Sequence, residues 1–362
     1  MRLAFHAFDV GPAQNHMLVA TAATLRGHVV TCHEGAALGE LELLAANPDV
    51  TVTSISSFQN AGEIALGLRA VERGIPWVVL TDTHEAWRRP PAQAHAGKVT
   101  AVLVAHPDEV GLAQAWGYSR ADFLGYPPLW GRTLRAIPSR DATRAKIKKS
   151  RPSQLSVFSS TQTYPLPLAP DDVLVLISGS KLTRITSELL AGAINAGQRM
   201  FGERLVVVLR PHPREELTAE ETAERRQLWG NVWRADTAAF PSSDFLVNGA
   251  DLVLTAAGAT LLVYAALCQR PAIHYRAPST EAWDRQQIGK PEWFPIERGA
   301  ALVAQGLDGI TAAMERLTDP GGAEALRVQQ TALYPYTHIE RAMDDPTDVK
   351  IVEFLEREFG RR

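Results

Sequence analysis

Polar residues follow the apolar runs that are expected to form buried strands. Asp9 and His16 come after the first run, and Asp82 and His84 come after a later one. The carboxyl ends of parallel strands form the usual ligand crevice of an open sheet, and a carboxylate or imidazole there can take a proton from an acceptor. His16 is the first candidate base, and Asp9 could orient it or act itself. Asp82 and His84 are the alternative base and orienter, with His84 toward the acceptor; simple helix capping is the structural reading of this pair.

A second group of residues could hold phosphate oxygens. Ser178, Gly179, Ser180 and Lys181 follow the strand expected over residues 172–177, and Arg184 lies one turn along the next helix. Small and hydroxyl residues beside an ammonium suit a phosphate, although an ordinary turn with an exposed lysine has the same composition. The G-x-x-x-x-G-K spacing is missing, which argues against nucleotide hydrolysis.

Two prolines surround a histidine at the end of the strand expected over residues 205–209. The sequence there is Arg210-Pro211-His212-Pro213. Each proline removes a backbone donor and restricts the residue before it, so the imidazole is held rigidly at the strand end. Arg210 and His212 are therefore candidate ligands of an anion, or His212 is a packed structural residue.

The stretch over residues 244–275 indicates strand, tight turn, helix and strand. Its turn contains Gly258 and Ala259, and Thr260 opens the helix. Small residues before a helix N-terminus let an anion approach the unpaired N–H groups. We predict phosphate contacts at these three residues; small-residue turns of parallel α/β units also serve packing alone.

The remaining sequence indicates an α/β protein of two domains. Strands alternate with helices along 362 residues, which predicts doubly wound parallel sheets. We place the domains at 1–150 and 151–340, with a closing helix in 341–362, and interpret the basic segment 140–151 and the following Ser/Thr/Pro-rich residues as a linker or surface loop. Residues 277–295 are expected to form another loop.

Several classes of function are disfavoured by the composition. The net charge of -3 argues against a protein that coats nucleic acid generally, and the G-x-G-x-x-G fingerprint of NAD(P) binding is absent. Aspartates and histidines lack metal-ligand spacing, so no metal and no cofactor are expected. Without a signal peptide or an apolar run of about 18 residues, and with Cys32 and Cys268 as reduced core residues, the sequence favours a cytoplasmic protein.

The order of residues resembles the C-terminal domain of GT-B glycosyltransferases. Asp251, Gly258, Ala259, Thr260 and Pro271 fit that pattern. The resemblance implies two Rossmann-like domains that face each other across a cleft, an N-terminal one for the acceptor and a C-terminal one for a nucleotide-sugar donor, with the last helix returning to the first domain. It also implies an inverting, metal-independent transfer, in which His16 is similar in place to the catalytic histidine of many such enzymes.

The proline-flanked histidine adds a second resemblance. Arg210 to Pro213 is similar to the "HP" element of bacterial sialyltransferases, Kdo transferases and teichoic acid glycerophosphotransferases, which use cytidine donors and whose histidine contacts the donor phosphate. Two departures stand beside it. Gly258 and Ala259 replace the later serine-rich element, and Tyr264 stands where many GT-B enzymes have a glutamate that binds the ribose. A UDP-sugar is slightly favoured over a cytidine type on general abundance.

Three other functions remain open. GT-B also houses non-hydrolysing sugar-nucleotide epimerases, which use several carboxylates near the sugar; no Glu or His pair matches their N-terminal cluster. Phage DNA glucosyltransferases are GT-B enzymes, and residues 140–151 could lie along DNA while the enzyme extracts a base. A degenerate module that only binds a nucleotide sugar is the non-catalytic reading. The acceptor is a saccharide, a lipid-linked group, a small molecule or a DNA base.

Overall fold

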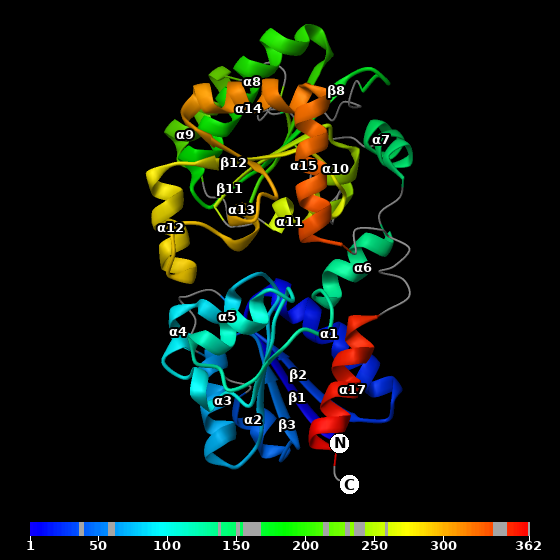
Figure 1. Ribbon diagram of the computed structural model, residues 1–362, viewed down its shortest axis with the longest axis vertical. Helices are drawn as coiled ribbons and strands as arrows, with labels where there is room; N and C mark the ends of the chain where they lie inside the picture. The colour runs from blue at the N-terminus through cyan, green and yellow to red at the C-terminus, as the bar shows by residue number, and fades with distance from the viewer. Residues whose placement is uncertain are drawn as a thin grey trace. The chain divides into compact units, whose positions relative to one another are not determined.

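The structure is a computed structural model that describes most of the chain. The residues outside the description are 36–39, 57–61, 137–138, 150–152, 155–167, 213–216, 229–231, 235–242, 258–259, 336–345 and 361–362. The chain forms two compact units (Figure 1). The first contains Met1–Arg135, Asp284–Trp293 and Glu340–Arg362, and the second contains Ala136–Trp283 and Phe294–Ile339.

The described part of the first unit is built on a six-stranded parallel sheet in the order β2-β1-β3-β4-β5-β6. The strands are β1 (Arg2–Ala7), β2 (Val29–Glu34), β3 (Val50–Thr53), β4 (Trp77–Leu80), β5 (Ala101–Leu103) and β6 (Ala121–Asp122). The helices are α1 (Val10–Leu25), α2 (Glu40–Ala45), α3 (Gly62–Glu72), α4 (Pro90–Gln93), α5 (Glu109–Trp116), α6 (Pro128–Ala136) and α17 (Thr347–Phe359), with short 3-10 turns at Ala86–Arg88 and Ala96–Lys98.

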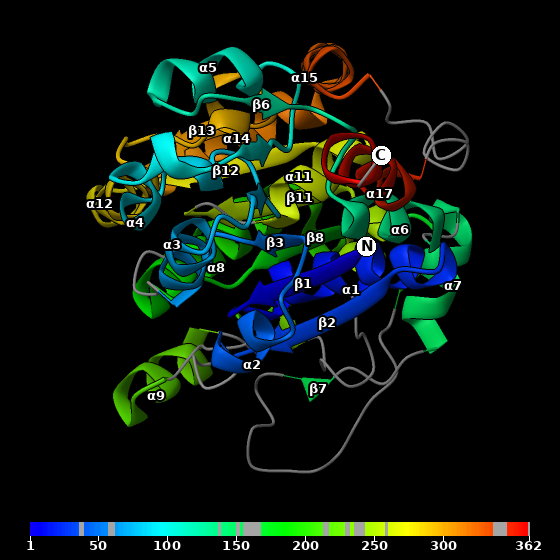
Figure 2. The ribbon, with the colours of Figure 1, turned by 90° about the horizontal axis from the view of Figure 1, so that it is seen from below.

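The C-terminal helix α17 packs against α1 in this unit (Figures 1 and 2). Val352, Phe354 and Leu355 are fully buried in the core cluster that also contains Phe5 of β1. Arg26 at the end of α1 donates two hydrogen bonds to Glu356, at 3.0 and 2.6 Å. Apolar burial therefore fixes the position of α17, and the exposed ion pair adds little to it.

The described part of the second unit is built on a seven-stranded sheet in the order β13-β12-β11-β8-β9-β10-β7. The strands are β7 (Ser153–Gln154), β8 (Val173–Ser178), β9 (Leu205–Arg210), β10 (Val232–Arg234), β11 (Leu252–Ala256), β12 (Ala272–Arg276) and β13 (Leu302–Gln305). The β10–β7 pair is antiparallel and the other described pairs are parallel. The continuous apolar runs of β8, β9 and β11 are buried, as expected for parallel strands covered on both faces.

The helices of the second unit connect these strands. They are α7 (Arg140–Lys149), α8 (Thr183–Phe201), α9 (Ala219–Leu228), α10 (Ser243–Gly249), α11 (Thr260–Leu267), α12 (Pro278–Ile288), α13 (Phe294–Glu297), α14 (Gly306–Thr318) and α15 (Pro320–Leu333), with a 3-10 turn at Gly202–Arg204. Residues 284–288 of α12 belong to the stretch that is grouped with the first unit. Leu189, Leu254 and Met314 lie at the centre of the core between sheet and helices.

The basic segment 140–151 was predicted as a linker or loop, and this prediction is wrong for the residues described. They form helix α7, which packs on α10. Arg140 and Arg144 both pair with Asp251, Arg144 through Nη1 at 3.0 Å. Arg144 also donates to the carbonyl of Asp172 at 2.8 Å. The charges hold the helix to its own unit, which composition alone does not reveal.

Two further sequence predictions are wrong. Residues 277–295, expected as a loop, contain α12 and the start of α13. The Pro/Ser/Thr signals at its start are a helix N-terminus, because the Thr280 hydroxyl oxygen accepts the N–H of Ala277 at 2.8 Å. Cys32 is exposed and Cys268 partly exposed, so neither is a core residue; Cys32 lies on β2, at the edge of its sheet.

In the described chain, helices fall short of the length and apolarity that crossing a bilayer requires.

Candidate functional site

Two loops that the sequence marked separately lie together in the second unit. Ser178 at the end of β8 is in register with Arg210 at the end of β9. The N–H of Gly179 donates to the carbonyl of Arg210 at 2.7 Å. A Cβ atom on Gly179 would lie 2.7 Å from the backbone nitrogen of His212, closer than atoms tolerate. Glycine is therefore required where the two loops touch.

The same loop fixes the beginning of α8. The N–H of Ser180 donates to the Thr186 hydroxyl at 2.9 Å, and the Ser180 hydroxyl accepts the N–H of Leu182 at 3.1 Å. Lys181 lies between Ser180 and Leu182 in the chain, and its ammonium is 5.4 Å from the centre of the Trp283 ring. The loop therefore holds a cation next to the first turn of a long helix.

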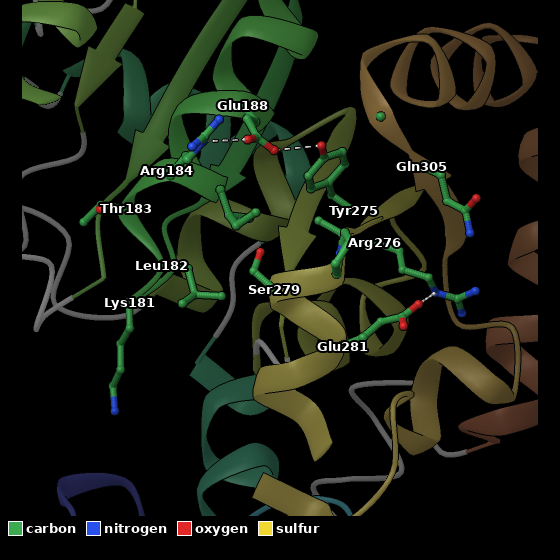
Figure 3. A pocket seen from close by; sticks show the side chains of 14 residues that line it. Lys181, Leu182, Thr183, Arg184, Glu188, Tyr275, Arg276, Ser279, Glu281 and Gln305 are labelled. Atoms are coloured by element: carbon green, nitrogen blue, oxygen red, sulfur yellow. Dashed lines mark hydrogen bonds and ion pairs between the residues drawn. The ribbon is translucent and has the colours of Figure 1, made fainter. Parts of the chain in front are cut away.

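A pocket of about 890 Å³ opens at this edge of the sheet (Figure 3). In the residues described, it lies where α8, α12 and α14 begin, after the carboxyl ends of β8, β12 and β13. Its lining consists of Lys181, Leu182, Thr183, Arg184, Ile185, Glu188, Tyr275, Arg276, Ala277, Pro278, Ser279, Glu281, Gln305 and Gly306. Helix N-termini carry unpaired N–H groups and a partial positive charge, so this edge suits an anionic ligand.

Charged side chains of both signs line the pocket. Arg276 lies 3.9 Å from Glu281, and Arg184 lies 3.4 Å from Glu188 with its own side chain 88% exposed. The Tyr275 hydroxyl donates to Glu188 at 2.8 Å. Burial, and then Glu188, raise the pKa of Tyr275 to about 12, so its phenol keeps its proton. The pocket thus offers cations for an anion and a carboxylate for a donor group.

In the first unit, His16 is buried beneath the ends of β3 and β4. Its Nε2 lies 3.0 Å from the Ser54 hydroxyl, which itself donates to the carbonyl of Leu80 at 3.1 Å. Because the single hydroxyl hydrogen is used on Leu80, Nε2 of His16 carries the hydrogen of that pair. Nδ1 has no hydrogen-bond partner within the described residues. Burial, and then His6, lower the pKa of His16 to about 3, so the ring is neutral at physiological pH.

The side chain of Asp82, which follows β4, lies near Gly11 at the N-terminus of α1. Its Oδ2 would be 3.5 Å from a Cβ on Gly11, and its buried Oδ1 has no hydrogen-bond partner in the part of the chain described. Burial raises the pKa of this carboxyl, Arg89 opposes the rise, and Asp9 adds to it. Asp9 is anchored by its own N–H, which donates to the Ser56 hydroxyl at 3.1 Å. Asp9 and Asp82 are thus close enough to influence each other.

Sequence reasoning missed two charged residues of this cluster. Glu63, on α3, accepts the N–H of Phe8 at 2.9 Å and both the N–H and the hydroxyl of Ser56, at 2.6 and 2.7 Å. Burial raises the pKa of Glu63, and its hydrogen bonds oppose the rise. Arg89 donates to the carbonyl of Ser56 at 2.6 Å. Nothing in a helix pattern distinguishes Glu63 from an exposed acid, so the sequence held no signal for it.

The chain is similar to known proteins at the level of structure. No family model matches the chain, and no curated protein matches it. Solved structures match along almost the whole length. The S. aureus MnaA–UDP co-structure has a TM-score of 0.61 at 12% identity, covering 98% of this chain and 96% of that one. UDP-GlcNAc 2-epimerase from Neisseria meningitidis, bound to UDP-GlcNAc, has a TM-score of 0.62 at 12% identity, covering 99% and 100%. MurG from Acinetobacter baumannii has 0.57 at 12%, covering 98% and 99%.

The fold is GT-B.

The predicted GT-B resemblance and the α/β fold class are confirmed. Of the small turn that belongs to the GT-B pattern, Gly258 and Ala259 lie outside the described residues. Ala257 before them has a φ of 46°, and Thr260 after them is exposed at the start of α11. Because β11 lies between β8 and β12, its carboxyl end, which Ala257 follows, is at the same edge of the sheet as the pocket. Tyr264, in place of the ribose-binding glutamate, is buried.

His84 occupies a different environment from the one predicted. It is fully buried in the GT-B first unit, with Nδ1 2.5 Å from Glu109. Glu109 also accepts the N–H of Glu85 at 2.9 Å and the indole N–H of Trp87 at 2.7 Å, and Trp293 donates to the His84 carbonyl at 3.2 Å. His84 thus presents no exposed surface to an acceptor, and the cluster positions the loop after β4.

Among described residues there is no group of His, Cys, Asp and Glu that could hold a metal.

Proposed function

We propose that this protein is a glycosyltransferase whose second unit holds a nucleotide-sugar donor in the pocket at the start of α8, α12 and α14. The pocket itself carries the proposal, because helix N-termini and Lys181 suit a diphosphate. The GT-B fold adds support, since S. aureus MnaA was solved with UDP and the N. meningitidis epimerase with UDP-GlcNAc. We therefore favour a UDP-sugar over a cytidine-type donor.

The second unit would stabilise the departing nucleotide. Transfer leaves negative charge on the phosphate, and prearranged donors favour that charge. We assign this role to the loop residues Ser178, Gly179, Ser180, Lys181 and Arg184, to Arg210 and His212 beside them, and to the turn ending at Thr260. Gly179 supports this assignment because it brings the first two loops into contact. No metal ion is required by this proposal.

The first unit would supply the base. An inverting transfer needs a group that takes the acceptor proton, and a carboxyl with a raised pKa is a stronger base than an ordinary one. Asp82 has that property and an oxygen without a partner among the described residues. We therefore propose Asp82 as the base, with Asp9 beside it. His16, neutral and bonded to Ser54, would position this edge of the sheet.

A second candidate, a sugar-nucleotide epimerase, is favoured by one observation. Asp82 and Glu63 are buried carboxyls with raised pKa values near the same loop, and paired carboxyls can remove and return a proton at a sugar carbon. The sequence had indicated no such cluster. The N. meningitidis UDP-GlcNAc 2-epimerase covers 99% of the chain, as does the solved glycotransferase of kitacinnamycin.

One incubation separates the two candidates. The protein is mixed in D₂O with UDP-GlcNAc or UDP-glucose and a panel of saccharide acceptors, and free UDP and sugar deuteration are measured together. A transferase releases UDP in proportion to a new glycoside and leaves the donor undeuterated. Deuterium in the recovered nucleotide sugar without UDP release supports the epimerase instead, and neither change with any donor contradicts both.

A further inference from the structure

Glu188 is the carboxylate of the pocket that is held in place by other side chains. It lies on the second turn of α8, and Figure 3 shows it between Arg184 and Tyr275, joined to both. Tyr275, a buried residue, donates its hydroxyl hydrogen to Oε2 at 2.8 Å, and Nε of Arg184 lies 3.4 Å from Oε1. Glu188 is therefore oriented before any ligand arrives.

The position of Glu188 matters because α11 lacks an acid. The sequence of α11, from Thr260 to Leu267, contains no acidic residue, and Tyr264 is buried. A ribose in this pocket would therefore find its charged acceptors elsewhere in the lining, where the described carboxylates are Glu188 and Glu281.

Glu188 has unused acceptor capacity. A carboxylate accepts about four hydrogen bonds, and the structure shows one from Tyr275 and a longer contact with Arg184. Its side chain remains 33% exposed while it lines the pocket. Two adjacent hydroxyl groups can donate to the free lone pairs, and hydrogen bonds to an ionised acceptor are the stronger kind.

The phosphates of the nucleotide would lie against the positively charged residues of the lining. Lys181 lies before α8, and Arg276 lies at the end of β12. Glu281, the other carboxylate of the described lining, lies 3.9 Å from Arg276 instead. A nucleotide would thus meet a fixed acceptor at Glu188 and positive charge at the loop and helix starts.

We propose that Glu188 binds the 2′- and 3′-hydroxyls of the donor's ribose, in place of the carboxylate missing from α11. This inference rests on the proposed function, since it assumes that the pocket holds a nucleotide. Tyr275 acts as a positioning residue, because its proton fixes Glu188. The enzyme therefore selects ribonucleotides over 2′-deoxyribonucleotides through α8.

Calorimetric titration of the full chain with paired ligands tests this assignment. The pairs are UDP with 2′-deoxy-UDP and CMP with 2′-deoxy-CMP, measured on the wild type and on Glu188→Gln, Tyr275→Phe and Glu281→Gln. We expect the wild type to prefer the ribonucleotide by about tenfold or more, as for a hydrogen bond to a charged group. Glu188→Gln should lose that preference while binding of the deoxy ligand stays unchanged.

The two other variants complete the test. Tyr275→Phe should reduce the preference several-fold, because it keeps the ring and removes the proton that orients Glu188. Glu281→Gln is the matched control and should leave the preference intact. Thermal melting confirms that each variant is folded. Equal binding of ribo- and deoxynucleotide to the wild type, or a preference that survives in Glu188→Gln, overturns the inference and leaves the proposed function standing. Failure of the wild type to bind any nucleotide overturns both.

Discussion

Gly179 and Arg210 join the two loops to which we assign donor binding. The N–H of Gly179 donates to the carbonyl of Arg210 at 2.7 Å, at the carboxyl ends of adjacent parallel strands. The loop that leads to Lys181 and α8 is thus fixed against the loop that carries His212. Any change that separates them should disturb the pocket without touching the remainder of the sheet.

Gly179→Ala tests this contact. The added methyl would lie 2.7 Å from the nitrogen of His212 and 2.9 Å from the carbonyl oxygen of Arg210. Both are backbone atoms and cannot rotate away, so we expect a loss of about 1–3 kcal/mol in the free energy of unfolding and weaker UDP binding. Gly111→Ala, with no atom within 4 Å, is the control and should not lower stability in urea denaturation, because alanine favours the helix α5 more than glycine does. A neutral Gly179→Ala would show that the loops are not held as described.

Replacement of Asp82 tests the assignment of the base. Asp82→Asn keeps the shape and removes the basic group, so we expect kcat to fall by about 10²–10⁴-fold. Burial raises the pKa of Asp82, and the acid limb of the wild-type rate profile should lie above the usual carboxyl range, with activity lost as pH falls through it. His16→Gln, which can still donate to Ser54, should retain that limb. If His16→Gln abolished turnover and Asp82→Asn did not, the base would be His16.

The buried His16 should make stability depend on pH. Its folded pKa of about 3 lies below the ordinary histidine value of 6.5, so the unfolded chain takes up a proton first as the pH falls below 6.5. Its contribution is fully present above pH 6.5 and is lost toward pH 3. The difference in unfolding free energy between wild type and His16→Gln should shrink by about 2 kcal/mol from pH 7 to pH 5.

His6 and His274, whose pKa values are lowered to about 4, act in the same direction but are present in both proteins of that comparison. Urea denaturation at the two pH values provides the measurement. A difference that does not change with pH would mean that His16 titrates equally in the folded and unfolded chains.

Arg144 separates a structural role for α7 from a nucleic-acid surface. It binds Asp251 and the carbonyl of Asp172, so Arg144→Met should lower the free energy of unfolding by about 1.5–3 kcal/mol. The exposed Arg327, paired with Glu324, is the control, and Arg327→Met should change stability little. Duplex DNA should not bind at low salt. Binding that weakens steeply with added salt would revive a DNA-directed enzyme.

The sequence predicted the fold well where buried strands are continuous. The runs at Trp77–Leu80 and Leu205–Arg210 form strands at nearly the expected bounds, because parallel strands covered on both faces leave an unbroken apolar signal. It failed where polar residues form structure through distant partners. Asp251 holds the helix at 140–149, and Thr280 caps the one at 278–288.

The candidate site was predictable only in part, for the same reason. Strand-end loops such as Ser178–Lys181 are visible in sequence order, since small and charged residues follow an apolar run. Glu188 and Tyr275 are far apart in sequence and meet only when α8 packs beside β12. Glu63 and Arg89 likewise meet through Ser56. No local pattern encodes such pairs.

A crystal structure of the full chain soaked with UDP tests the central claim most directly. We expect the nucleotide to occupy the pocket at the start of α8, α12 and α14, with its phosphates near Lys181 and its ribose against Glu188. Nucleotide bound elsewhere on the chain, with this pocket empty at saturating UDP, would contradict it.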